Sequence, residues 1–195
     1  MKVVAKISAI MVIILACAVS VFADSEAPPT DYTKETENGQ YIFVMLASGD
    51  LSSGRRWVSK KAEIRDKYKI SGMYRNDGST NPLWEVYWYS FSVYPSSDGK
   101  YVVRIGPWAQ STSNLAIAFY KEGKELEKYF IHDLVENEEY LKHTVSHFFW
   151  RTDLRYDDKE QTVFIKTVDN ISYLFSVKTG EIIKKEKIGP ARTVK

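Results

Sequence analysis

Short apolar runs separated by turn residues occur along most of the chain. Residues 41–47 are almost continuously apolar and end at a Ser-Gly-Asp turn, which is typical of a buried β-strand. In residues 84–94 the large side chains fall on both faces of a strand, because side chains alternate with a period of two. A strand with two apolar faces needs cover on both sides, so the pattern predicts layered or radially stacked sheets.

Hairpin signals follow this segment. An Asp-Gly pair within residues 96–99 tolerates the positive φ of hairpin turns, and the strand predicted at 101–105 is ended by Gly106 and Pro107. Two further hairpins are predicted around glycine-containing turns. Their strands span residues 115–120 with 126–131, and residues 171–177 with 182–188.

The last two hairpins indicate an internal repeat. Gly123 and Gly180 hold equivalent places in their turns and are 57 residues apart. Each hairpin also follows a polar turn and one more strand, at 101–105 and at 162–167. We interpret this as a repeat of about 57 residues, each unit a meander of at least three strands, although two unrelated hairpins would look similar.

The expected fold class is therefore all-β and mainly antiparallel, built from β-meander repeats. Residues 60–68 fit a short helix or an exposed strand equally well, so we expect at most one or two short helices. Both a partial-propeller arrangement and a sandwich are compatible with these elements.

Several motifs carry a family resemblance. Residues 97–103 resemble the S-x-D-G-K strand entry of periplasmic WD-type and Tol-associated propeller repeats, and the meanders resemble β-propeller blades. Propellers have about 4 to 8 blades, so a partial propeller, a sandwich and a propeller completed by another chain all stay open. Over residues 71–180 the chain resembles secreted bacterial proteins without an assigned activity, through S-G-x-Y-R-N-D-G-S, P-L-W, G-P-W-A and V-S-H-x-x-W motifs. This resemblance implies a fold and a compartment but no chemistry.

Residues 1–23 are typical of a signal peptide. A basic start precedes an apolar run at 7–22, which is at or below the length that a spanning helix needs. We predict cleavage after Ala23, which makes the mature chain secreted or periplasmic, with no membrane span. A membrane anchor and a lipoprotein processed at Cys17 are the competing interpretations, and the apolar residues after Cys17 weigh against the second.

The predicted mature chain has two parts. Residues 24–40 are polar and include two prolines, so we expect a flexible linker, whereas residues 41–195 form a single β-rich domain. Cleavage after Ala23 removes the one cysteine, which excludes disulfides and thiol catalysis. Cleavage also removes two of the 27 basic residues, so that 25 basic residues remain beside 25 acidic ones. A net charge of zero argues against nucleic acid as a partner.

Histidines and carboxylates offer little catalytic signal. His143 and His147 have the spacing of metal ligands on a helix, but their β-branched and aromatic neighbours favour a strand, so we predict neither a metal site nor a cofactor. No G-x-S-x-G turn is present, and Ser146 beside His147 does not make a catalytic pair, since neighbouring strand residues point apart. A hydrolytic carboxylate pair could come from Glu85 with Asp133 or Asp153.

The aromatic residues give the best binding candidate. Trp108 follows the Gly106-Pro107 break and precedes a polar loop, where a large ring has no period-two reason to be buried. It could stack on a sugar or a peptide side chain, with Gln110 and Asn114 as hydrogen-bond partners and His147 as a further candidate. A ring that caps the end of a sheet is the alternative.

The sequence therefore leads to two function classes. The first is a non-enzymatic secreted or periplasmic binding or scaffold module that presents a loop surface to a protein, peptide or glycan. The alternative is an extracellular hydrolase that uses carboxylates or His147. The two differ in whether titratable groups converge in one cleft.

Overall fold

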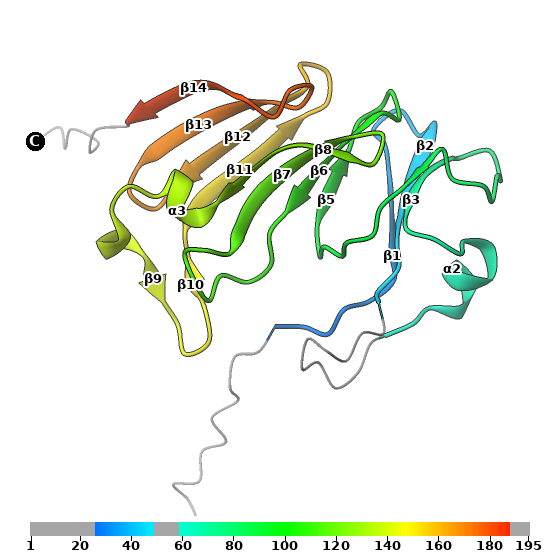
Figure 1. Ribbon diagram of the computed structural model, residues 1–195, viewed down its shortest axis with the longest axis horizontal. Helices are drawn as coiled ribbons and strands as arrows, with labels where there is room; N and C mark the ends of the chain where they lie inside the picture. Colours follow the sequence, from blue (N-terminus) through cyan, green and yellow to red (C-terminus); the bar gives the residue numbers. More distant parts are fainter. Residues whose placement is uncertain (1–25, 49–58, 188–195) are drawn as a thin grey trace, which may run out of the picture.

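The computed structural model describes residues 26–48 and 59–187, which form mainly antiparallel strands (Figure 1). Three four-stranded sheets follow each other along the chain, each with its strands hydrogen bonded in sequence order. The first sheet contains β1 (Tyr32–Glu35), β2 (Tyr41–Met45), β3 (Gly72–Arg75) and β4 (Trp84–Glu85). The second contains β5 (Val93–Pro95), β6 (Tyr101–Ile105), β7 (Leu115–Lys121) and β8 (Lys124–Phe130), and the third contains β11 (Arg151–Asp157), β12 (Thr162–Thr167), β13 (Ile171–Ser176) and β14 (Ile182–Lys187).

The remaining elements are short. A two-stranded ladder pairs β9 (Lys142–His143) with β10 (Phe148–Phe149). Within the described residues, the helices are α2 (Ala62–Lys67), α3 (Ile131–Leu134) and a single 3-10 turn, η2 (Glu138–Tyr140). The prediction of an all-β, mainly antiparallel fold with short helices is confirmed. Across the part of the chain that the structure describes, no helix has the length and apolar character to cross a membrane.

The second sheet lies between the other two (Figure 1). Val103 on β6 and Phe119 on β7 face the third sheet, in a core that also holds its buried strand residues. Their neighbours Val102 and Tyr120 point the other way and pack with the first sheet. Because both faces are covered, the sheets stack face to face as successive blades would, without closing a ring within the described residues.

The segment 84–94 is not the single strand that its pattern predicts. Only Trp84 and Glu85 belong to β4, and the chain then crosses irregularly to β5 in the next sheet. Val86 is buried in the core between the two sheets, whereas Tyr87 is 90% exposed. Residues 84–94 are mainly a connection between two sheets, and most of their apolar side chains pack in the core between those sheets. The alternation of apolar residues in such a connection can resemble that of a strand.

The first hairpins of the first two sheets share one turn motif about 60 residues apart. In each, a hydroxyl oxygen accepts a hydrogen bond from the backbone N–H five residues later, Thr36 from Tyr41 at 3.1 Å and Ser96 from Tyr101 at 2.9 Å. The third sheet has its first hairpin turn between β11 and β12. Each of the three sheets thus has four strands and begins with a hairpin.

These turns also contact each other. The Asn38 amide Nδ2 donates to the Ser97 carbonyl at 2.8 Å, and the Ser97 N–H donates to the Asp158 carboxylate at 3.0 Å. A line of hydrogen bonds thus joins all three sheets at one end. Within the segment predicted as a flexible linker, the residues of β1 form a strand that pairs along its whole length with β2. The residues of this edge strand are mostly polar, so the hydrophobic pattern of the sequence does not predict the strand. The predicted signal peptide lies outside the described residues.

A compact helical segment covers the outer side of the first sheet. Ile42, Val44, Tyr68 and Tyr74 form a small core there, with Ile64 of α2 packed against it. Residues 60–68, for which the sequence left helix and strand open, therefore include a helix.

Candidate functional site

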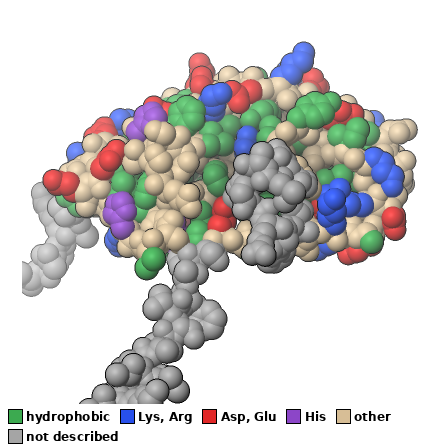
Figure 2. Space-filling view, turned by 60° about the horizontal axis from the view of Figure 1, so that its bottom comes forward, with side chains coloured by type: hydrophobic (Ala, Val, Ile, Leu, Met, Phe, Trp, Pro, Cys, Tyr) green, Lys and Arg blue, Asp and Glu red, His purple; other side chains and the backbone are tan. Residues whose placement is uncertain are grey.

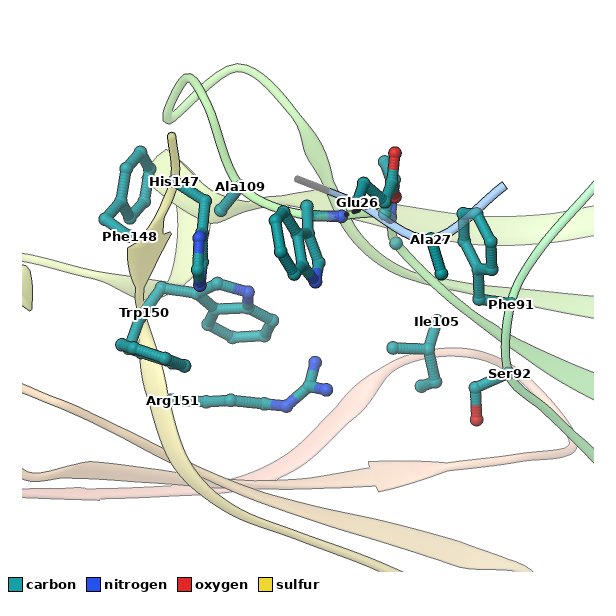
Figure 3. Close-up of a pocket in the computed structure, with 14 residues that line it drawn as sticks. Glu26, Ala27, Phe91, Ser92, Ile105, Ala109, His147, Phe148, Trp150 and Arg151 are labelled. Atoms are coloured by element: carbon teal, nitrogen blue, oxygen red, sulfur yellow. Dashed lines mark hydrogen bonds between the residues drawn. The ribbon is translucent and has the colours of Figure 1, made fainter. Parts of the chain in front are cut away.

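A cavity of about 410 Å³ opens at one end of the second and third sheets, opposite the end where the hairpin turns are hydrogen bonded to each other. Figure 3 shows residues that line it. It lies where β6 ends and β11 begins, and we call it the Trp108 cavity. Its walls include Phe91, Ile105, Trp108, His147, Trp150 and Arg151. The volume is within the range of about 300 to 1,000 Å³ that is usual for small-ligand sites.

Trp108 is held in place by its backbone. At the end of β6, Gly106 approaches β7 so closely that a Cβ there would lie 1.6 Å from the Leu115 carbonyl oxygen, so only glycine fits. The N–H of Trp108 donates to the Glu26 carboxylate at 3.2 Å. The next residue, Ala109, accepts a hydrogen bond from the N–H of Phe148 at 2.9 Å, which brings this loop against β10.

His147 stacks on the indole of Trp108. The ring centroids are 4.1 Å apart and the planes differ by 22°. The Thr144 hydroxyl lies 2.8 Å from His147 Nδ1, and Phe149 approaches the imidazole edge-on at 4.9 Å. The β9–β10 turn therefore carries a preformed aromatic wall, and the two candidates Trp108 and His147 lie together.

Arg151 extends from the start of β11 into the cavity, between Trp150 and Ile105 (Figure 3). The register between β11 and β12 shifts between Arg151 and Asp153, an irregularity of the kind that redirects side chains at sheet rims. The guanidinium carbon lies 5.2 Å from the ring centroid of Trp150. Burial lowers the pKa of Arg151, because desolvation disfavours the charged form, although a guanidinium remains protonated at neutral pH.

The other two sequence candidates do not line the cavity. The Asn114 side-chain oxygen accepts hydrogen bonds from the N–H groups of Gln110 and Ser111, both at 2.8 Å, and so closes the polar loop on itself. Gln110 is exposed. Asn114 therefore shapes the loop that follows Trp108, and its oxygen is already engaged.

The carboxylates proposed for hydrolysis do not meet at this site. Glu85 accepts from the Tyr87 hydroxyl, Asp133 from the N–H of Phe130, and Asp153 pairs with Arg155. Among the residues that line the Trp108 cavity, Glu26 is the one carboxylate.

The histidines lie in separate surroundings. His143 is in β9 with its ring against Phe148, and the turn to β10 separates it from His147, so the pair is on neither a helix nor a single strand. His132 lies 3.0 Å from the Thr112 carbonyl oxygen. Within residues 26–48 and 59–187, no group of three or more His, Cys, Asp or Glu side chains is arranged to hold a metal ion.

Charges on the face that carries the cavity are mixed. Figure 2 turns this end of the molecule forward and shows acidic and basic side chains interspersed, with hydrophobic side chains between them and histidine side chains toward one side. Such a face produces no strong field of one sign.

Comparison with known proteins shows a likeness at the level of structure. No protein-family model matches the chain, and no curated protein matches it. Among solved structures, the β-propeller domain of Myceliophteria thermophila Cps50 (Swd1) is similar, with 15% sequence identity and a TM-score of 0.35 over 86% of this chain. The chain spans 58% of the length of that structure.

Sequence reasoning missed several residues of this site. Trp150 belongs to a motif in the sequence, but its place in a run of aromatic residues is equally typical of core. Glu26 and Arg151 have no sequence signal, because their positions follow from the path of the N-terminal segment and from the irregular start of β11.

Proposed function

We propose that this chain is a non-enzymatic binding module that receives a flat apolar group of a partner protein or peptide in the Trp108 cavity. The observation that carries this proposal is the stacked pair of Trp108 and His147 at a cavity of ligand size. Aromatic rings that present a face to such a cavity are suited to stacking on a planar group.

The preformed state of the wall supports the proposal. Backbone hydrogen bonds fix Trp108 through Glu26 and fix the adjoining loop through Phe148. A wall that is already ordered loses little side-chain entropy on binding, so more of the contact energy is available for affinity.

A neutral aromatic probe tests the site. N-acetyl-L-phenylalaninamide should bind with a Kd of about 1 to 10 mM, which is expected of a single ring with few polar contacts. Trp108→Ala should weaken this binding at least about tenfold by removing the stacking face. Ligand-observed NMR titration measures both values.

Tyr87→Ala is the matched control, since Tyr87 is an exposed aromatic residue that does not line the cavity. Its removal should leave the titration unchanged. Equal binding by the Trp108→Ala variant, or a lack of saturation by the unmodified protein, would contradict the proposed function.

We also propose that the protein is secreted or periplasmic, which the leader-like residues 1–23 support. N-terminal sequencing of protein from the native host should then begin at Asp24. Recovery of an acylated chain beginning at Cys17 would replace this proposal with a lipoprotein, and recovery of Met1 would contradict export with cleavage.

A further inference from the structure

The Trp108 cavity contains an arginine that forms no ion pair within the described residues, and the one carboxylate in its lining, Glu26, accepts from the backbone of Trp108. Arg151 is half-buried, its side chain extends into the cavity, and its guanidinium makes no hydrogen bond or ion pair with any residue that the structure describes. Arg155, four residues further along β11, instead pairs with Asp153 at 3.0 Å. A partly enclosed guanidinium without an anionic partner in the protein favours an anionic ligand.

Other donors in the wall point to the same chemistry. The indole Nε1 atoms of Trp108 and Trp150 donate no hydrogen bond to a residue in the described ranges, and both residues line the cavity. On the acceptor side, Glu26 already accepts from the backbone of Trp108. The cavity therefore offers more donors than acceptors, and a ligand group that only accepts suits it best.

We infer that the Trp108 cavity binds the C-terminal residue of a peptide or protein, with its carboxylate on Arg151 and an aromatic or large aliphatic side chain against Trp108. This inference rests on the proposed function and adds the charge and the chemical class of the ligand. A C-terminal residue carries a carboxylate and an apolar side chain on one carbon, so a single residue meets both features of the cavity. A guanidinium binds a carboxylate through two parallel hydrogen bonds.

An acidic sugar has the same charge but suits the walls less well. Its hydroxyl groups donate as well as accept, and each donor left without an acceptor in an enclosed site weakens binding. The walls offer the Ser92 hydroxyl and the partly engaged Glu26 and His147, alongside mainly apolar surface. A peptide terminus with an apolar side chain leaves fewer such groups unsatisfied.

The experiment compares a charged probe with its neutral counterpart. N-acetyl-L-phenylalanine and N-acetyl-L-phenylalaninamide differ only in that a carboxylate replaces an amide, and D-glucuronate represents the acidic sugar. Each is titrated by ligand-observed NMR at neutral pH. The acid should bind at least about tenfold more tightly than the amide and than glucuronate, because the hydrogen bonds to Arg151 are charge-assisted.

Two matched variants locate the effect. Arg151→Gln should abolish the preference for the acid over the amide, and an unchanged urea midpoint of this variant shows that it remains folded. Arg155→Gln removes the same charge from the same strand and should keep the preference, since Arg155 is exposed and lies over Phe164, which does not line the cavity.

The outcomes separate this inference from the proposed function. Equal binding of acid and amide overturns the inference and leaves the proposed function standing, whereas no binding of either probe overturns both. Glucuronate binding as tight as that of the acid reassigns the site to an acidic glycan. Loss of the preference in Arg155→Gln as well would show an effect of overall charge and overturn the role of Arg151.

Discussion

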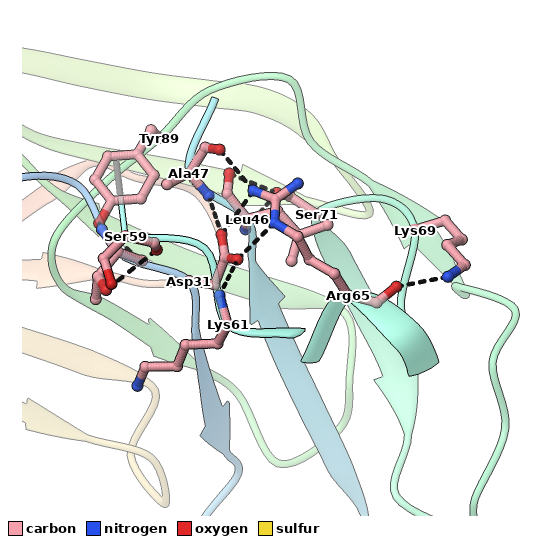
Figure 4. Close-up of polar contacts among 10 residues, drawn as sticks. Asp31, Leu46, Ala47, Ser59, Lys61, Arg65, Lys69, Ser71 and Tyr89 are labelled. Carbon is pink, nitrogen blue, oxygen red and sulfur yellow. Dashed lines mark hydrogen bonds and ion pairs between the residues drawn. The ribbon is translucent and has the colours of Figure 1, made fainter. Parts of the chain in front are cut away.

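Replacing Asp31 with alanine is expected to lower the free energy of unfolding by roughly 3 to 5 kcal/mol, the usual cost of removing one partner of a buried ion pair. The Asp31 side chain is fully buried, and its two oxygens accept from Arg65 at 2.6 and 2.8 Å (Figure 4). They also accept from the N–H groups of Ala47 and Lys61. One carboxylate thus joins the segment before β1, the end of β2 and the start of α2.

Urea denaturation of the variant and of the unmodified protein measures this effect as a midpoint shift at unchanged slope. Glu186→Gln is the control, because Glu186 forms an exposed pair with Lys184, and such pairs contribute about 0 to 1 kcal/mol. A shift for Asp31→Ala no larger than that of the control would show that the cluster does not anchor the fold.

Acid should weaken the same anchor. Burial by itself raises the pKa of Asp31, but the Arg65 guanidinium and the two backbone N–H groups outweigh burial, so the pKa lies below its usual 3.8. A carboxylate whose pKa is lower in the folded state stabilises the protein fully above its unfolded pKa, and this contribution is lost as the pH falls through the folded pKa. The acid-induced loss of stability below about pH 4 should therefore be shallower in Asp31→Asn than in the unmodified protein.

Replacing Trp88 with alanine is expected to cost roughly 3 to 5 kcal/mol of unfolding free energy, as large aromatic truncations in a core do. The Trp88 ring packs between Phe43 of the first sheet, at 6.1 Å between centroids, and Tyr120 of the second, at 4.9 Å. The Arg104 guanidinium lies 4.8 Å from the same ring. Loss of the ring would leave a void between the two sheets, next to Phe43 and Tyr120.

Two further variants make the comparison informative. Trp88→Phe keeps a ring and removes an indole N–H that is buried without a hydrogen-bond partner in the described structure, so its cost should be less than about half that of alanine. Trp108→Ala should cost only about 1 kcal/mol, since the half-exposed ring mainly loses its stack with His147. Equal urea midpoint shifts for the two alanine variants would make Trp108 a structural cap and remove the basis of the proposed site.

For Trp88 the sequence correctly predicts a ring that packs inside the protein, but it assigns the ring to the wrong kind of element. The alternation in residues 84–94 predicts a central strand with two apolar faces, and the structure places Trp88 in a connecting segment. Trp88 is partly buried there, because the connection crosses between two stacked sheets and packs against their core from its edge. The strands with both faces covered by other sheets are β6 and β7. In β6, for example, Val102 and Val103 point into different cores.

The candidate site was predictable only in part. Trp108 stands out because the Gly106-Pro107 break removes it from the strand pattern, and the structure places it at the cavity with His147. Gln110 and Asn114 were grouped with Trp108 by nearness in sequence, but neither residue lines the cavity. Asn114 instead bonds to the backbone of its own loop, which is a common local use of an Asn side chain.

Local patterns in the sequence determined the all-β, antiparallel character of the chain, its hairpin turns and its repeated meanders, because alternation and turn residues act over a few neighbouring positions. Only the tertiary structure decided that β1 belongs to the first sheet, since a polar edge strand has no hydrophobic signal until its partner is present. The structure alone also brought Trp108, His147 and Arg151 to one cavity. That meeting depends on how two sheets stack and on one register shift at the start of β11, and neither is encoded in the spacing of residues along the chain.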